Sequence, residues 1–177
     1  GNWNIEEYVC EPDMNAHVIN TLDYDISLKF IRSTFGKLAE NFSDSETVGF
    51  SLFIYRNIMF AGQNRRMWDE HFNECFEEEY GFDPAPYYTL MFRDFGGSSR
   101  RYKCMLMSCR AKMLVEGYLK AVSYYCKAHN VFCTGFPAES KAAACSWLFG
   151  DGQMLHKYAS APGGSMPFAY LYGLNGI

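Results

Sequence analysis

Two acidic residues lie where a carboxylate could take part in acid–base or nucleophilic chemistry. Glu139 follows the short apolar run Val131–Thr134, so we expect it just beyond the carboxyl end of a buried strand. Asp151 lies within Gly150-Asp151-Gly152. Both residues also have simpler explanations, because Glu139 suits the first turn of a following helix and Gly-Asp-Gly suits a turn. Glu139 and Asp151 are therefore the candidate catalytic residues, and a purely structural role is the alternative for each.

Paired carboxyl groups serve acid–base chemistry, and hydrolysis of a glycosidic bond is one reaction of this kind. One group donates a proton and the other acts as nucleophile or base, at a separation of about 5 Å in retaining enzymes. Aromatic side chains would hold such a substrate, because their faces stack on the apolar faces of sugar rings, although most aromatic residues at helical spacing belong to a core. The candidate substrate-binding residues are Tyr55, Arg56, Trp68 and His156, and the wider aromatic supply includes Tyr87, Tyr88, Trp147 and Tyr158.

Cysteine and histidine raise the alternative of a metal site. Cys126, His129, Cys133 and Cys145 are close enough in sequence to suggest zinc. However, the chain has no Cys-x-x-Cys pair, and Cys133 falls on a predicted strand. The chain has 7 cysteines, an odd number, and several lie on apolar stripes of predicted helices. We therefore expect buried free thiols, no metal and no cofactor, which favours a reducing, cytoplasmic location.

Two further kinds of site find little support in the sequence. The 4 histidines are not accompanied by a triad or nucleophile-elbow signature. The segment Gly96–Arg101 could hold a phosphate at a helix start, but it lacks the glycine-lysine-serine pattern of a nucleotide loop. An ordinary capped turn is the simpler prediction there.

Composition predicts a packed globular chain. The 177 residues are 49% hydrophobic, 20% charged and 18% aromatic, which suits one domain over residues 1–177. The formal net charge of −4 argues against a nucleic-acid partner. No window reaches the ~18 apolar residues of a membrane span, and the first residues lack a basic region followed by an apolar run. We expect neither a membrane segment nor a leader.

Hydrophobic periodicity predicts helices that clearly outnumber strands. A first helix begins near Asp23 or Asp25, and a second carries the stripe Trp68, Phe72, Cys75, Phe76 and Tyr80 and stops at Gly81. A third runs from Gly96–Ser99 to Asn130, and a fourth is expected over residues 140–149. The non-alternating apolar runs Val48–Tyr55 and Val131–Thr134 indicate strands covered on both faces. Together these elements predict an α/β class with a parallel sheet.

Three segments of the chain carry a family resemblance in their order and spacing. They are Leu22–Asp25 followed by Phe30-Ile31 and Thr47–Ser51, then Trp68–Phe76 followed by Glu79–Asp83, and last Cys126–Gly135 with Glu139. In this order they resemble part of the catalytic barrels of glycoside hydrolases from many gut bacteria, those similar to α-L-rhamnosidases and to the broader retaining β-glycosidase group. The resemblance implies a (β/α) barrel fold and carbohydrate as ligand.

The chain departs from this family in length and in its expected catalytic acid. A complete eight-stranded barrel needs ~250 residues, so 177 residues imply a partial barrel, a segment of a larger one. Tyr55-Arg56 stands where the family has an acidic pair, and Phe136 stands where it has histidine. We therefore expect a glycoside hydrolase-like segment with little or no independent activity. The alternative is a noncatalytic module that binds sugar or a partner chain, and exposed sheet edges predict self-association or an added cover.

Overall fold

The computed structural model describes residues 5–9, 11, 19–42, 49–54, 67–137 and 154–162. Helices occupy most of these residues. In chain order the elements are α1 (Tyr24–Phe42), β1 (Gly49–Ile54), α3 (Phe72–Tyr80), the 3₁₀ helix η1 (Ala85–Met91), α4 (Ser99–Leu114), the π-helix η2 (Val115–Leu119), α5 (Lys120–Ala128), β2 (Phe132–Pro137), the 3₁₀ helix η3 (Met154–His156) and β3 (Ala161–Pro162).

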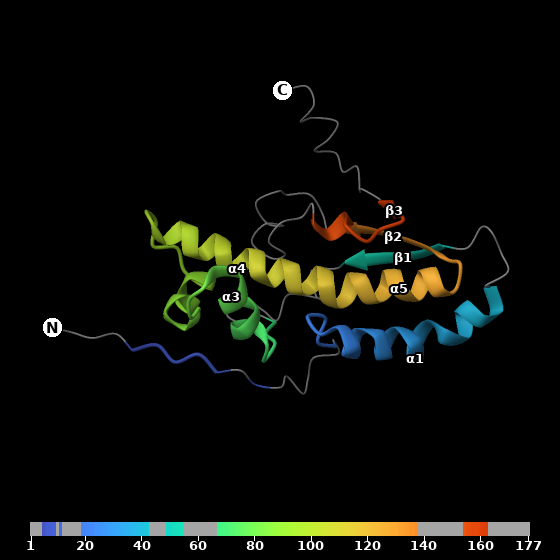
Figure 1. The fold of residues 1–177 in the computed structure, drawn as a ribbon, viewed down its shortest axis with the longest axis horizontal. Helices are drawn as coiled ribbons and strands as arrows, with labels where there is room; N and C mark the ends of the chain where they lie inside the picture. Colours follow the sequence, from blue (N-terminus) through green and yellow to red (C-terminus); the bar gives the residue numbers. More distant parts are fainter. Residues whose placement is uncertain are drawn as a thin grey trace, which may run out of the picture.

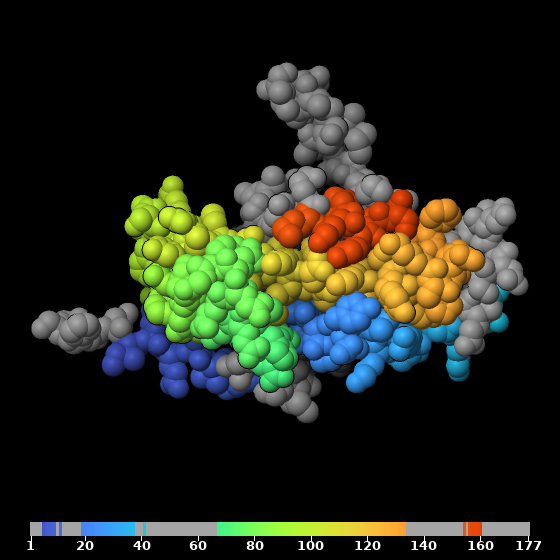
Figure 2. Space-filling model, viewed as in Figure 1, coloured from blue at the N-terminus to red at the C-terminus, as the bar shows by residue number. Residues whose placement is uncertain are grey.

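A long helical rod, formed by α4, η2 and α5 without a break, organises the described chain (Figure 1). α1 packs against α5 and η2, and α3 and η1 pack against α4. β2 contacts α5, and Figure 1 shows the strands on the other side of α5 from α1. In the space-filling view, α3 and η1 (green) and α1 (blue) cover neighbouring parts of the rod (Figure 2).

Short-range signals set the helix ends, as predicted. Asp23 caps α1, because its Oδ1 accepts a hydrogen bond from the Ile26 N–H at 2.7 Å. Gly81 ends α3 in the left-handed conformation, with φ of 79° and its N–H donating to the Glu77 carbonyl. Asn130 follows α5 with φ of 53°, a conformation that asparagine tolerates better than most residues. One predicted helix start and two predicted helix ends are confirmed, and of the two residues proposed for the start, Asp23 is the cap.

The buried core is made chiefly by side chains of helices that face one another. Phe72 and Phe76 of α3 are completely buried, and Leu106 and Leu114 of α4 are buried with them. Trp68 precedes α3 and packs partly buried against Phe72, at 4.2 Å between ring centroids. The predicted apolar stripe therefore supplies the core.

The predicted fold class, an α/β partial barrel built on a parallel sheet, is wrong: the described chain is mainly helical, and its parallel strands are few and short. The longest helix has 19 residues and the rod is longer still, whereas the described strands have 6, 6 and 2 residues. β1 pairs with β2 and β2 with β3, all in parallel, and Gly49 lies opposite Phe132. The described part of the chain shows no barrel and no repeated β/α units. The physical reason is that the apolar faces of the helices pack on one another and form a helical core. In a barrel, the same faces would pack on a central sheet.

The cysteines follow the prediction of buried thiols only in part. Cys109, Cys126 and Cys133 are buried and free, and burial raises the pKa of the Cys109 thiol to about 12. Cys75 is half-buried, but Cys104 is exposed, so the expectation is wrong for that residue. Cys10 and Cys145 lie outside the described residues, as does the helix expected over residues 140–149.

A polar cluster joins the π-helix η2 to the segment that follows η3. The Glu116 carboxylate accepts hydrogen bonds from Tyr158 Oη at 2.8 Å, from Lys157 Nζ at 2.5 Å and from Lys120 Nζ at 3.2 Å. Burial alone would raise the pKa of Glu116, but these three donors outweigh it and lower the pKa to about 2. The cluster thus attaches residues 154–162 to the rod.

This cluster predicts a specific loss of stability in acid. The folded pKa of Glu116 lies below the ordinary glutamate value of 4.5, so the stability that its contacts contribute is complete above pH 4.5 and disappears as pH falls toward about 2. The side chain is 33% exposed, so screening by solvent limits the effect to ~1 kcal/mol. Urea unfolding of wild type and Glu116→Gln between pH 6 and 2 measures it. The stability difference should shrink on acidification, and a constant difference would contradict the prediction.

Candidate binding cleft

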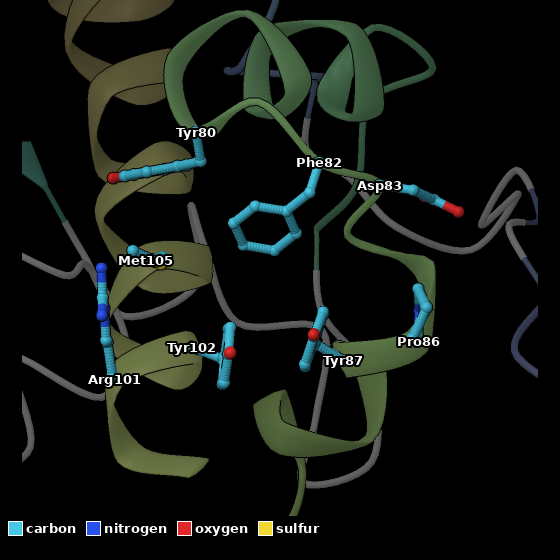
Figure 3. Close-up of a pocket in the computed structure, with 8 residues that line it drawn as sticks. All are labelled: Tyr80, Phe82, Asp83, Pro86, Tyr87, Arg101, Tyr102 and Met105. Atoms are coloured by element: carbon cyan, nitrogen blue, oxygen red, sulfur yellow. The ribbon is translucent and has the colours of Figure 1, made fainter. Parts of the chain in front are cut away.

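The described part of the chain contains an open cleft between α4 and the segment that joins α3 to η1. Its volume is about 550 Å³. Figure 3 shows α4 on one side, the turn after α3 and the start of η1 on the other, and the Phe82 ring between them. The residues that line the cleft are Tyr80, Phe82, Asp83, Pro86, Tyr87, Arg101, Tyr102 and Met105.

Three aromatic rings form the floor of this cleft. The rings of Tyr87 and Tyr102 stack at 4.2 Å between centroids with an interplanar angle of 14°. Phe82 meets both edge-on, at 5.6 Å from Tyr87 and 5.9 Å from Tyr102. Offset stacks and edge-to-face pairs are the preferred aromatic geometries, so the rings hold one another in place. The three rings therefore form one packed aromatic surface at the floor of the cleft.

Polar groups border the aromatic floor. Arg101 and Asp83 are both exposed at the cleft, on opposite sides in Figure 3. A hydrogen bond with Tyr102 is the main cause of the raised pKa of Tyr87, so the Tyr87 hydroxyl stays protonated near neutral pH. The pKa of Tyr80 is also raised, in this case chiefly because the side chain is partly buried. The cleft thus offers neutral hydroxyls, one cation and one carboxylate to a ligand.

Local sequence explains how these residues reach the same place. Gly81 ends α3, and the Asp83 carboxylate accepts a hydrogen bond from the Ala85 N–H at 2.9 Å, which starts η1 after Pro84. This tight turn places Phe82 and Tyr87 beside each other. Arg101, Tyr102 and Met105 belong to the first turns of α4. Asp83-Pro84 thus opens the short 3₁₀ helix η1.

The helix start at Gly96–Ser99 positions the α4 side of the cleft. Gly96 and Gly97 have positive φ, of 65° and 54°, and the Asp94 carboxylate accepts a hydrogen bond from the Gly96 N–H at 2.9 Å. Ser99 Oγ donates to the Gly96 carbonyl. These contacts form a turn before α4, as in the simpler of the two interpretations of this segment, but the Ser98 side chain does not cap the helix.

Four of the sequence-predicted site residues lie outside the described residues. They are Glu139, Asp151, Tyr55 and Arg56. Trp68 and His156 are described, but neither lines the cleft. Trp68 packs against Phe72 and Tyr88, and His156 lies partly buried in η3. Neither predicted catalytic residue is among the described residues, so their pairing with a substrate-binding residue stays a prediction.

Of the wider aromatic supply, Trp147 lies outside the described residues, and Tyr87 is the one described member that lines the cleft. Phe82, Tyr102 and Met105 are not among the ligand-binding candidates that the sequence singled out. A usable signal was the density of aromatic residues on either side of Gly81 and Asp83-Pro84, since a sharp turn brings such side chains close together.

A carboxylate–imidazole pair lies near the start of α3. Asp69, which is 5% exposed, accepts hydrogen bonds from Asn20 Nδ2 at 2.5 Å and from the His71 N–H at 2.8 Å, and its Oδ1 lies 3.0 Å from His71 Nδ1. The contact with Asp69 raises the pKa of His71. Such a pair can orient a general base, but Asp69 also starts α3 and joins it to the segment before α1. Within the described ranges, no hydroxyl or thiol hydrogen-bonds to the His71 ring.

The described residues contain neither a cluster of metal ligands nor a membrane-spanning helix. Among the described side chains, His, Cys, Asp and Glu nowhere form a group of three or more that could hold a metal ion. Of the described helices, none has the length and hydropathy of a membrane span.

Comparison with known proteins gives no further guide to this chain. No family model matches the sequence, and neither a curated protein nor a solved structure matches it significantly.

Proposed function

We propose that this chain is a noncatalytic binding module whose cleft takes a carbohydrate. The observation that carries the proposal is the aromatic floor formed by Phe82, Tyr87 and Tyr102, bordered by Arg101 and Asp83. The flat C–H face of a sugar ring packs on an aromatic face, and its hydroxyls need a few hydrogen-bonding groups around that face. A concave site with apolar walls and a small number of polar groups is typical of small-ligand binding.

The composition of the cleft favours binding over hydrolysis. A glycosidase generally needs two carboxyl groups on either side of the scissile bond. Asp83 is the one carboxylic acid among the side chains that line this cleft, and its carboxylate already accepts the Ala85 N–H. A segment of a catalytic barrel is also a poor description of a chain with a helical core. Both points support the noncatalytic alternative.

The proposal predicts that sugar binding depends on Tyr102. A panel of soluble oligosaccharides, added to the whole isotope-labelled chain, should move the NMR signals of cleft residues for at least one sugar. Tyr102→Ala should weaken that binding about 3- to 10-fold, because an aromatic contact contributes ~0.5–1.5 kcal/mol. Tyr124→Ala is the matched control, since Tyr124 is 55% exposed on α5 and does not line the cleft.

Two results would count against this function. The first is a complete absence of shifts at the cleft for every sugar at millimolar concentration. The second is steady turnover of simple aryl glycosides that disappears in Glu139→Gln, which would restore an enzymatic role. We expect no such turnover.

A further inference from the structure

The N-terminal residues Ile5–Val9, here called the strap, lie against the end of η1 and the residues that follow it. Glu6 is the centre of the contact. Its carboxylate accepts hydrogen bonds from Tyr8 Oη at 2.7 Å and from Thr89 Oγ1 at 3.0 Å, and pairs with Arg93 Nη1 at 2.5 Å. These contacts lower the pKa of Glu6, so it is ionised at neutral pH.

The Tyr8 ring supplies the apolar part of the same contact. It stacks on Phe92 at 5.4 Å between centroids with an interplanar angle of 23°, and it meets Tyr88 edge-on at 6.1 Å. Residues that alternate along an extended segment project to the same side, so Glu6 and Tyr8 can engage one surface together. This surface, made by Tyr88, Thr89, Phe92 and Arg93, is here called the strap site.

The strap is held by side chains alone. In the part of the chain that the structure describes, no main-chain hydrogen bond joins residues 5–9 to the rest of the molecule. Ile5 is 90% exposed and Val9 is 65% exposed, so Glu6 and Tyr8 make the contacts of the strap that the described residues show. Arg93 is 58% exposed, and ion pairs at that exposure contribute little. The space-filling view shows the strap (dark blue) along the outer edge of the molecule (Figure 2).

The strap site, in contrast, is fixed by contacts that do not involve the strap. Tyr88 Oη donates to Asn73 Oδ1 of α3 at 2.5 Å, and the Tyr88 ring meets Trp68 edge-on at 5.0 Å. Met91, which precedes Phe92, is 2% exposed in the core. These contacts hold Tyr88 and the backbone before Phe92 without the strap, so we expect the site to change little when the strap leaves.

We propose that the strap site is a docking surface for an extended acidic–aromatic peptide segment of a partner protein, with glutamate two residues before tyrosine, and that the strap occupies it in cis. The partner's glutamate would replace Glu6 between Thr89 and Arg93. Its tyrosine would take the place of Tyr8 on Phe92. The strap and the partner segment then compete for one surface, so release of the strap controls access. The sugar cleft uses other side chains, and this inference does not depend on it.

The experiment uses the full chain and a blocked peptide of residues 4–9 as the probe for the partner segment. Tyr8→Ala frees the strap site, so the peptide should bind this variant and shift the NMR signals of Thr89, Phe92 and Arg93. Wild type should bind at least 10-fold more weakly, because a tethered competitor acts at an effective concentration in the millimolar range. Equal binding to both chains, or binding to neither, would overturn the proposal.

Matched peptides and a charge reversal test the recognition itself. A peptide with glutamine at the position of Glu6 should lose binding, whereas glutamine at the position of the exposed Glu7 should not. Arg93→Glu should reject the original peptide and accept one with arginine in place of Glu6, while sugar binding stays intact. Failure of that exchange would contradict the assigned contact. Wild type could instead form a dimer without added peptide, and Tyr8→Ala could abolish that dimer. This result would show that the strap of a second copy occupies the site, and it would refute an external partner.

Discussion

Phe72→Ala is expected to lower the free energy of unfolding by ~3–5 kcal/mol, because it removes a large aromatic side chain from a closed site. Phe72 is 0% exposed, and its ring lies 4.2 Å from Trp68 and 6.0 Å from Phe76. These neighbours are themselves large rings on one short helix and the segment before it. They cannot collapse into the cavity without moving α3, so most of the cost should persist.

Equilibrium urea unfolding, followed by circular dichroism, measures this loss. The matched control is Phe95→Ala, since Phe95 is the same residue type but 61% exposed. The control should change stability by less than ~0.5 kcal/mol, as is usual for surface positions. A loss below ~1 kcal/mol in Phe72→Ala would show that the α3 stripe does not form the core.

Gly117→Ala is expected to destabilise the chain by ~2–4 kcal/mol, although alanine is the better helix former by ~1 kcal/mol. A Cβ on Gly117 would lie 2.6 Å from the Leu22 carbonyl oxygen and 2.9 Å from the Thr21 carbonyl oxygen. Both neighbours are backbone atoms, and both residues are buried, so neither can swing away as a flexible side chain would. The segment that leads into α1 would have to move off the rod.

Gly36→Ala is the matched control for this substitution. Gly36 lies within α1, and the atom nearest to an added Cβ is Tyr125 Oη at 3.9 Å, an ordinary contact distance. Alanine there should raise the stability by up to ~1 kcal/mol. Opposite signs for the two glycines in the same urea assay are the expected result. A stabilising Gly117→Ala would mean that the Thr21–Leu22 segment does not lie against η2.

Gly117 belongs to the π-helix η2, the wider turn in the middle of the rod. This wider turn occurs where the rod meets the Thr21–Leu22 segment and where Glu116 receives Lys157 and Tyr158. π-helical turns are uncommon and often lie at places where a helix accommodates a particular neighbour. Here the turn adjusts the rod to two segments that are distant in sequence, one on each side of it.

Several parts of the fold were determined by the sequence alone, because they depend on contacts within a few residues. Capping by Asp23, termination at Gly81 and the left-handed Asn130 each follow from the chemistry of one side chain and its own backbone. The stripe that buries Phe72 and Phe76 follows from helical periodicity. These predictions needed no knowledge of the neighbouring elements.

Only the tertiary structure decided what the apolar faces pack against. Periodicity identifies a buried face but not its partner, so the same stripes suited helices on a parallel sheet and helices on one another. The cleft is also a tertiary feature, since it joins Phe82 and Tyr87 to Tyr102 across two separate elements. The contact of the strap with its site joins residues that are 83 positions apart in the sequence. The Glu116 cluster joins residues that are 42 positions apart. Such contacts depend on how chain segments meet in space, and no local pattern of residue types records that.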